Sequence, residues 1–261
     1  MHWYQPDGSP FYEVPNKSKP GETREATIRD AKKVGAYPSF STFKSQLYNP
    51  GIVNYQLREL SKVWYDQVEL VTSHGAEANS IVYDPWPDAH KTAIRLSQEP
   101  RNEAANFGIE VHDAIEWAIK DQRPVPEHLT DTVTPILHKL FDLFPREEWQ
   151  SETHFCNTRE KFGGMVDLWH PSGIVGDVKS QKTKDGKITF YDEWCMQLAA
   201  YSHGLDEPFA KCFNIAASST NPGVWDIKWY NEKELDKAWE KVKLLRDYWY
   251  LETGYEPGGA K

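Results

Sequence analysis

Cysteine is scarce in this chain. Three cysteines, Cys156, Cys195 and Cys212, occur in 261 residues, and no two of them stand in a CxxC pair. An odd number of widely spaced thiols argues against a disulfide framework, and it supplies neither the ligands of a zinc site nor those of an iron–sulfur cluster. We therefore expect no iron–sulfur cluster and a reducing compartment.

Long hydrophobic runs and an excess of positive charge are also missing. No run approaches the ~18 apolar residues that predict a membrane span, and residues 1–22 lack the apolar segment of a signal peptide. We expect no membrane partner and a cytoplasmic location. With 30 Lys and Arg against 39 Asp and Glu, the net charge is -9, so a polyanion would need a local basic patch to bind.

Aromatic residues, in contrast, are abundant. They make up 13% of the chain, with 11 Trp, and hydrophobic residues make up 39%, which is enough for the core of one large domain. Residues 1–36 are rich in Pro, Gly and charge, and we expect an irregular or hairpin-like N-terminal extension there. Residues 37–261 are expected to form a single domain, with a helical lead-in over 37–145 and a core over 104–252.

The order of the predicted elements indicates the fold class. Phe107, Val111, Ile115 and Ile119 recur at helical spacing within a predicted helix over 102–121. The other predicted elements are a helix over 51–71, a turn over 83–90, a helix over 126–144, strands at 149–156, 162–170 and 173–180, a helix over 191–205, strands at 209–218 and 224–231, and a closing helix. This order predicts an α/β (α+β) fold in which helices flank a central mixed β-sheet.

Two predicted strands each carry an acid within an apolar run. Asp167 lies in the first, and Asp177 lies in the second with Lys179 two residues later, so Asp177 and Lys179 share one face. A tight turn over 170–173 would bring Asp167 near Asp177, although the sequence does not fix the register. Adjacent carboxylates repel unless a cation neutralises them, and these oxygens, with the Val178 carbonyl, suit Mg²⁺ or Mn²⁺.

Such a metal would polarise a phosphoryl oxygen and lower the pKa of a bound water. Lys179 would then orient or deprotonate that water, or balance charge on the phosphoryl group, and the sequence does not choose between these roles. Taken alone, a D-x-K triplet is more often a surface ion pair.

Two helical pairs accompany these acids. Gln197 and Tyr201 are four residues apart on a predicted helix, and so are His112 and Glu116 on an earlier one. An amide and a phenol on one face suit contact with a phosphate or a water, and the histidine suits a metal or a group beside it. Either pair is also compatible with an ordinary helix surface.

The most basic short segment follows the second acid. Lys182, Lys184 and Lys187 fall within nine residues of Lys179, and they form a candidate contact for backbone phosphates of DNA. A solvated loop is an equally good reading of this segment.

Four motifs occur in the order "GIEVHDAIE", "GGMVDLW", "GDVKS" and "QLAAY". Together they resemble the PD-(D/E)XK nuclease superfamily, in particular its RecB-like branch, which includes phage exonucleases and the mitochondrial genome maintenance exonuclease. The resemblance covers residues 104–203. It maps the family's motif positions onto His112, Asp167, Asp177, Lys179, Gln197 and Tyr201. Glu152 is similar in position to an acid that some members carry, although an exposed strand glutamate explains it equally well.

The resemblance implies an αβββαβ core and Mg²⁺- or Mn²⁺-dependent hydrolysis of DNA. It implies a metal shell drawn from His112, Asp167 and Asp177, to which the Val178 carbonyl is added by its position. It also implies catalytic roles for Lys179, Gln197 and Tyr201 beside the two acids. Glu116 and Glu152 are further candidates. We expect an exonuclease acting on DNA ends, with a preference for single strands, among phage-type recombination or replication proteins. The alternatives are a structure-specific or restriction-type endonuclease and a non-catalytic DNA-binding or assembly protein.

Overall fold

The structure is a computed structural model that describes residues 2–47, 53–63, 86–207 and 210–258. It divides into two compact units, Met1–Gln46 with Gly108–Lys261, and Leu47–Phe107. We call the first the sheet unit because it contains every strand of the described residues. The second unit contains a helix over residues 53–63 and the first part of α4 (Trp86–Lys120).

Helix α4 begins earlier than the sequence pattern predicts. Residues 86–90 are helical, whereas a turn was expected over 83–90, of which residues 83–85 lie outside the described residues. The turn was predicted from its prolines, but a proline in the first turn of a helix removes only an N–H that has no partner within the helix. Of the helix expected over 51–71, residues 53–63 are described, and they are helical.

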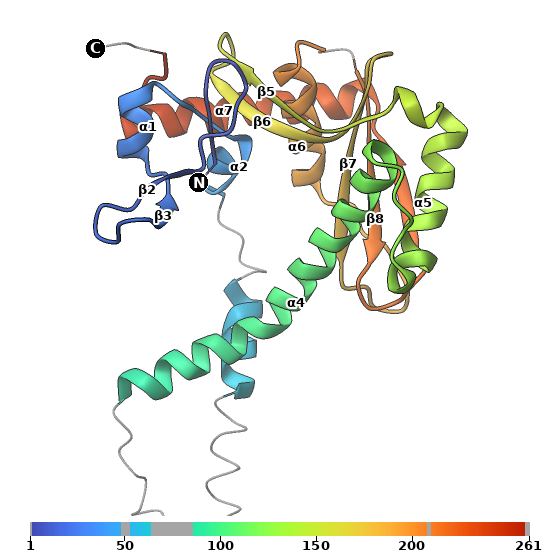
Figure 1. Ribbon diagram of the computed structural model, residues 1–261, viewed down its shortest axis with the longest axis horizontal. Coiled ribbons are helices and arrows are strands. Elements are labelled where there is room, and N and C mark those ends of the chain that lie inside the picture. The colour runs from blue at the N-terminus through green and yellow to red at the C-terminus, as the bar shows by residue number, and fades with distance from the viewer. Residues whose placement is uncertain (1, 48–52, 64–85, 208–209, 259–261) are drawn as a thin grey trace, which may run out of the picture. The chain divides into compact units, whose positions relative to one another are not determined.

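The sheet unit is built around a five-stranded sheet, seen near the centre of Figure 1. Its strands lie side by side in chain order: β5 (Gln150–Asn157), β6 (Phe162–His170), β7 (Ile174–Gln181), β8 (Lys211–Ser218) and β9 (Trp225–Trp229). Strands β7 and β8 are parallel, and every other neighbouring pair is antiparallel. The predicted mixed sheet is therefore confirmed.

Helices cover both faces of this sheet. Helix α6 (Asp192–Gly204) connects the parallel strands β7 and β8 and packs on one face, and α7 (Glu232–Thr253) packs against α6 (Figure 1). On the other face lies α5 (Thr130–Leu143), flanked by short 3₁₀ turns at Glu127–Leu129 and Arg146–Glu148. Trp149 ties α5 to the sheet, since its indole N–H donates to the Leu140 carbonyl and its ring contacts Phe213 of β8. The helices flanking the sheet are likewise confirmed.

The N-terminal residues are part of the sheet unit. They form two small antiparallel pairs, β1 (Trp3–Tyr4) with β4 (Tyr37–Pro38) and β2 (Glu13–Pro15) with β3 (Thr23–Glu25), and two helices, α1 (Ile28–Val34) and α2 (Phe40–Lys44). Trp3 is fully buried against Trp249 and Tyr255, and its indole N–H donates to the Ala26 carbonyl. The expected extension over residues 1–36 is thus anchored by its own aromatic side chain. No helix among the described residues is long and apolar enough to cross a membrane.

Two glycines allow α6 to lie close to the sheet. The ring of Phe155 on β5 sits between Gly164 of β6 and Gly204 of α6, where a Cβ atom would lie 2.6 Å and 2.1 Å from that ring, respectively. A Cβ on Gly164 would also lie 3.5 Å from the ring of Tyr201. The absence of side chains at these positions therefore lets Tyr201 approach the strands that carry the acids.

We predict that Gly204→Ala lowers the free energy of unfolding by about 1–3 kcal/mol, the usual cost of overpacking a buried site. Phe155→Leu removes the ring that the added methyl group would strike, so Gly204→Ala should cost less in that background. Urea denaturation followed by circular dichroism measures both single variants, the double variant and the wild type. An equal cost in the two backgrounds would show that the ring is not the obstacle.

Candidate active site

The site begins where the β6–β7 hairpin opens. The two strands pair at Leu168–Gly176, Trp169–Val175 and His170–Ile174. The next position in this register sets Asp167 opposite Asp177, but the ladder stops before it. Instead, the Asp167 carboxylate accepts a hydrogen bond from the Val178 amide, with a distance of 2.9 Å between Oδ2 and N.

The Asp167 side chain therefore replaces the main-chain acceptor that the Val178 amide would have in a regular ladder. The hairpin brings Asp167 and Asp177 to one level of the sheet, as the sequence predicted, and it fixes the register that the sequence left open.

The side of the sheet that the β6 side chains face also changes at Asp167. Val166 belongs to the core that underlies α6, whereas Leu168 lines a small cavity with His112 and Ile115 of α4. Residues two apart in a regular strand face the same side, so the change of side between positions 166 and 168 marks an irregularity centred on Asp167.

Strand β5 has a matching irregularity. Its register sets Glu152 opposite Asp167, but the ladder pairs only the neighbouring residues Ser151 and Thr153 with β6. Glu152 has a φ of 48°, which is the left-handed region that residues other than glycine seldom adopt. The two adjacent strands are thus distorted at the same level, beside the acids.

Asp177 is held from two sides. Its Oδ1 lies 2.6 Å from the Lys179 ammonium, which confirms that these two residues share a face, and its Oδ2 lies 2.6 Å from the Asn214 amide nitrogen. Asp177 and Asn214 have no exposed surface, whereas the Lys179 side chain keeps 21% of its surface exposed.

Burial raises the pKa of Asp177 to about 6, partly opposed by the Lys179 ammonium and reinforced by Asp167. Burial by itself lowers the pKa of Lys179, but the carboxylates of Asp177 and Asp167 outweigh it and leave the pKa above its usual value. Burial of this ion pair shifts the pKa of Asp177 toward the neutral form, because Asp177 has no exposed surface. The lysine therefore stays charged at neutral pH.

His112 reaches the same place from α4. Its Nε2 lies 2.9 Å from the Val178 carbonyl oxygen, so this nitrogen carries the hydrogen and donates it. Its Nδ1 lies 3.5 Å from Oδ2 of Asp167. The histidine thus contacts both the carbonyl and one of the acids that were predicted to bind a metal.

Glu116 and Glu152 line the small cavity that also contains His112 and Asp167. Burial raises the pKa of Glu152, and the neighbouring carboxylates of Glu116 and Asp167 add to the shift against the opposing charge of Lys120. Glu116 is itself paired with Lys120 at 2.7 Å. Both acids that the sequence offered as further candidates therefore lie beside Asp167.

Gln197 and Tyr201 face the acids from α6. The Gln197 amide donates to the Tyr201 hydroxyl at 2.5 Å. Burial, followed by the charges of Asp167 and Asp177, raises the pKa of Tyr201 well above its usual value. The phenol therefore keeps its proton and remains able to donate a hydrogen bond.

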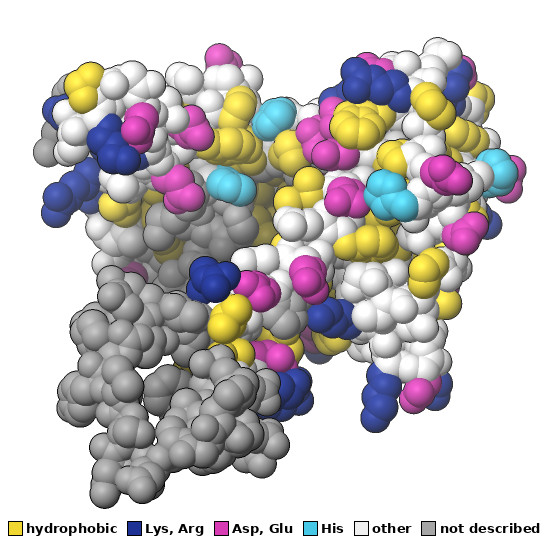
Figure 2. All heavy atoms as spheres, turned by 60° about the horizontal axis from the view of Figure 1, so that its bottom comes forward, with side chains coloured by type: hydrophobic (Ala, Val, Ile, Leu, Met, Phe, Trp, Pro, Cys, Tyr) yellow, Lys and Arg dark blue, Asp and Glu magenta, His cyan; other side chains and the backbone are white. Residues whose placement is uncertain are grey.

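The three lysines that follow β7 are placed differently. Lys182, Lys184 and Lys187 lie in the connection from β7 to α6, are exposed, and form no ion pair with another described residue. Asp and Glu side chains are scattered among Lys and Arg on the face shown in Figure 2, without a broad basic surface. Attraction of a polyanion would consequently depend on local segments such as this one.

The donor atoms fit a hard divalent cation. Among the described residues, no group of three or more His, Cys, Asp or Glu side chains is placed to hold a metal ion. The candidate set is therefore smaller: the carboxylates of Asp167 and Asp177 with the Val178 carbonyl, while His112 lies beside this set and donates to that carbonyl. All donor atoms of this set are oxygens, which Mg²⁺ and Mn²⁺ prefer. Oδ1 of Asp167 accepts no hydrogen bond from a described residue, and a nearby cation would favour ionisation of the buried Asp177.

Sequence reasoning missed Asn214. The residue is a single amide inside the buried strand "KCFNIAAS", and an isolated polar residue in an apolar run is the same signal that drew attention to Asp177. Its pairing with Asp177 depends on the parallel alignment of β7 with β8, which a pattern in one strand does not reveal.

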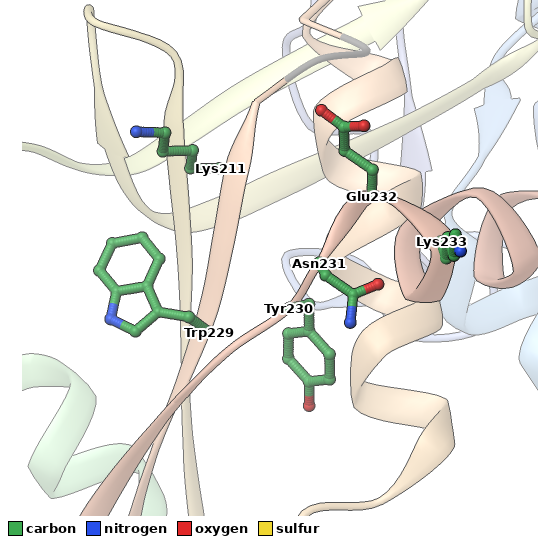
Figure 3. Close-up of a pocket in the computed structure, with 6 residues that line it drawn as sticks. All are labelled: Lys211, Trp229, Tyr230, Asn231, Glu232 and Lys233. Atoms are coloured by element: carbon green, nitrogen blue, oxygen red, sulfur yellow. The ribbon is translucent and has the colours of Figure 1, made fainter.

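A separate hollow lies at the other end of β8 and β9. It is lined by Lys211, Trp229, Tyr230, Asn231, Glu232 and Lys233. Figure 3 shows Trp229 and Tyr230 pointing in different directions, with Lys211 and Lys233 at opposite sides of the view. Asn231 is already engaged, since its side chain caps α7. In this view the labelled side chains do not converge on one point.

No family model matches the chain, and no curated protein matches it. Among solved structures, the crystal structure of SSO0001 aligns with 16% sequence identity and a TM-score of 0.26. The alignment covers 44% of this chain and 59% of that chain, less than two thirds of its length. A likeness at this level carries no argument about fold or function.

The raised pKa of Asp177 makes a prediction about stability. The folded state holds this proton to a higher pH than the unfolded chain, so ionisation of Asp177 destabilises the fold as the pH rises through about 6. Relative to Asp177→Asn, the free energy of unfolding of the wild type should fall by about 2–3 kcal/mol between about pH 4 and pH 7. Urea denaturation in EDTA at several pH values measures it, and parallel curves for the two proteins would contradict it.

Proposed function

We propose that this protein is a divalent-metal-dependent nuclease that hydrolyses phosphodiester bonds at DNA ends. The observation that carries the proposal is the meeting of Asp167 and Asp177 where β6 and β7 separate, with the Lys179 ammonium 2.6 Å from Asp177. The element order α4–α5–β5–β6–β7–α6–β8, with two helices before the first strand of the sheet, contains the αβββαβ order of the nuclease superfamily that the motifs resemble.

Three oxygen donors would hold the metal. These are the carboxylates of Asp167 and Asp177 and the carbonyl of Val178, and His112 orients that carbonyl through its hydrogen bond. When bound, Mg²⁺ or Mn²⁺ supplies a Lewis acid that lowers the pKa of a water and stabilises charge on the phosphoryl group. The hydrogen bond from the Val178 amide holds the Asp167 carboxylate beside the residue that follows Asp177.

Lys179 acts as a charged donor in this proposal. Its raised pKa keeps the ammonium protonated at neutral pH, so it orients the attacking water and balances the charge that develops on the phosphoryl oxygens. Gln197 and the protonated Tyr201 donate hydrogen bonds from the α6 side, where a phosphate oxygen or the water would lie.

The connection after β7 would hold the DNA backbone. Lys182, Lys184 and Lys187 offer three exposed charges directly after the strand that carries Asp177 and Lys179. We propose single-stranded ends as the preferred substrate and, by the resemblance to phage exonucleases, recombination or replication as the setting.

Cleavage of end-labelled linear DNA tests the proposal. We predict shortening from an end with Mg²⁺ or Mn²⁺, none in EDTA, and a loss of about 100-fold or more in rate for Lys179→Ala. Lys211→Ala, which removes an exposed lysine from β8, should leave the rate unchanged. A wild-type protein that cuts no DNA with either metal would overturn the proposal. Digestion of a covalently closed circle would replace an exonuclease by an endonuclease.

The connection from β7 to α6, with its three exposed lysines, leads to a separate prediction about DNA binding. A triple Gln variant at positions 182, 184 and 187 should reduce the slope of log affinity for single-stranded DNA against log salt concentration by about 2, since each phosphate contact contributes about 0.7. Fluorescence anisotropy in EDTA measures this without cleavage.

The matched control removes three exposed lysines from the N-terminal residues, Lys19, Lys32 and Lys33. This control changes the net charge by the same amount. If the two triple variants change the salt dependence equally, the connection is not a specific contact and only the net charge matters.

A further inference from the structure

Asn214 is the nearest neutral partner of Asp177. The parallel ladder aligns the two residues on adjacent strands β7 and β8. The Asn214 amide nitrogen lies 2.6 Å from Oδ2 of Asp177 and 3.4 Å from its main-chain carbonyl oxygen. One amide therefore contacts both the side chain and the main chain of the same acid, and neither residue has exposed surface.

The orientation of this amide is determined by chemistry. A carboxylate and a carbonyl only accept hydrogen bonds here, so the NH₂ group of Asn214 must face Asp177. Its own carbonyl oxygen, Oδ1, is then buried and accepts no hydrogen bond from a described residue. Burying an unpaired acceptor is unfavourable, so the contact with Asp177 is maintained at a cost that an apolar residue of the same size would avoid.

The two oxygens of Asp177 have different partners. Lys179 donates to Oδ1 and Asn214 donates to Oδ2. Because a planar carboxylate bonded at both oxygens has little freedom to rotate, Asn214 keeps the group in place when Lys179 turns toward another charge. A neutral amide does this without adding a positive charge that would repel a cation.

We propose that Asn214 is a positioning residue that fixes the Asp177 carboxylate for binding of a divalent cation. This inference rests on the proposed function because it takes Asp177 to be a metal ligand. Groups that orient metal ligands typically change metal affinity by about 10–100-fold when removed. A residue that only satisfied the buried carboxylate during folding would affect stability and leave the cation affinity of the folded protein unchanged.

Binding of Mn²⁺ tests the inference without requiring cleavage. Asn214→Leu keeps the approximate size of the side chain and removes its donors. We expect it to weaken Mn²⁺ binding by about tenfold or more, measured by electron paramagnetic resonance of the free ion. Asn214→Ala serves if the leucine variant does not fold, and circular dichroism establishes folding before each titration. Cys212→Ala, a buried change two residues away on β8, should bind Mn²⁺ as the wild type does.

A cleavage assay gives a second readout. If Asn214 positions the ligand, the Mg²⁺ concentration for half-maximal rate rises in Asn214→Leu, while the rate at saturating Mg²⁺ falls less. An unchanged Mn²⁺ affinity in a folded Asn214 variant overturns the inference, whatever the nuclease activity.

The two proposals can fail separately. A wild-type protein that binds Mn²⁺ but cuts no DNA overturns the nuclease proposal, and weaker binding by the Asn214 variant then still supports the positioning role. A wild-type protein that binds no Mn²⁺ overturns the positioning role itself, because there is no bound cation for Asp177 to hold.

Discussion

The hydrogen bond between the Val178 amide and the Asp167 carboxylate is the contact on which the site depends. It occupies the place where the β6–β7 ladder would otherwise continue, so the strands separate without leaving this amide unpaired. Separation makes room for Asp177, Lys179 and the histidine of α4 at a level that regular pairing would fill.

Burial then determines the pKa of Asp177. Asp177 has no exposed surface, and its raised pKa reflects a carboxylate that lacks enough compensating charge. Lys179 supplies part of that charge, and Asn214 supplies a neutral donor. Buried acids with shifted pKa values are often found at functional sites. A divalent cation, if bound there, would supply the compensating positive charge directly.

Much of the sheet unit was predictable from local pattern. Strand β6 has the bounds that its composition indicated, Phe162–His170, and the period of two placed Asp177 and Lys179 on one face. These strands were predictable because the alternation of apolar and polar residues, and the turn residues that end a strand, are visible within a few positions of sequence. Local pattern also placed the six motif residues in helices and strands that the structure contains: His112, Asp167, Asp177, Lys179, Gln197 and Tyr201.

The remaining features depend on contacts between distant segments. The left-handed backbone of Glu152 occurs where its pairing with β6 is interrupted, and the Asp177–Asn214 contact is set by the alignment of two parallel strands. The burial of Trp3 depends on aromatic residues near the other end of the chain. None of these constraints is contained in a short window of sequence.

The change of side in β6 at Asp167 has a consequence for entropy. Asp167 has neighbours on two helices, since His112 of α4 lies 3.5 Å from its carboxylate and the charge of that carboxylate helps to raise the pKa of Tyr201 on α6. These groups project from helices and strands whose main chains are already ordered. Ordering a flexible segment costs about 1–2 kcal/mol per residue, and a site assembled in this way would lose little of that freedom when a ligand binds.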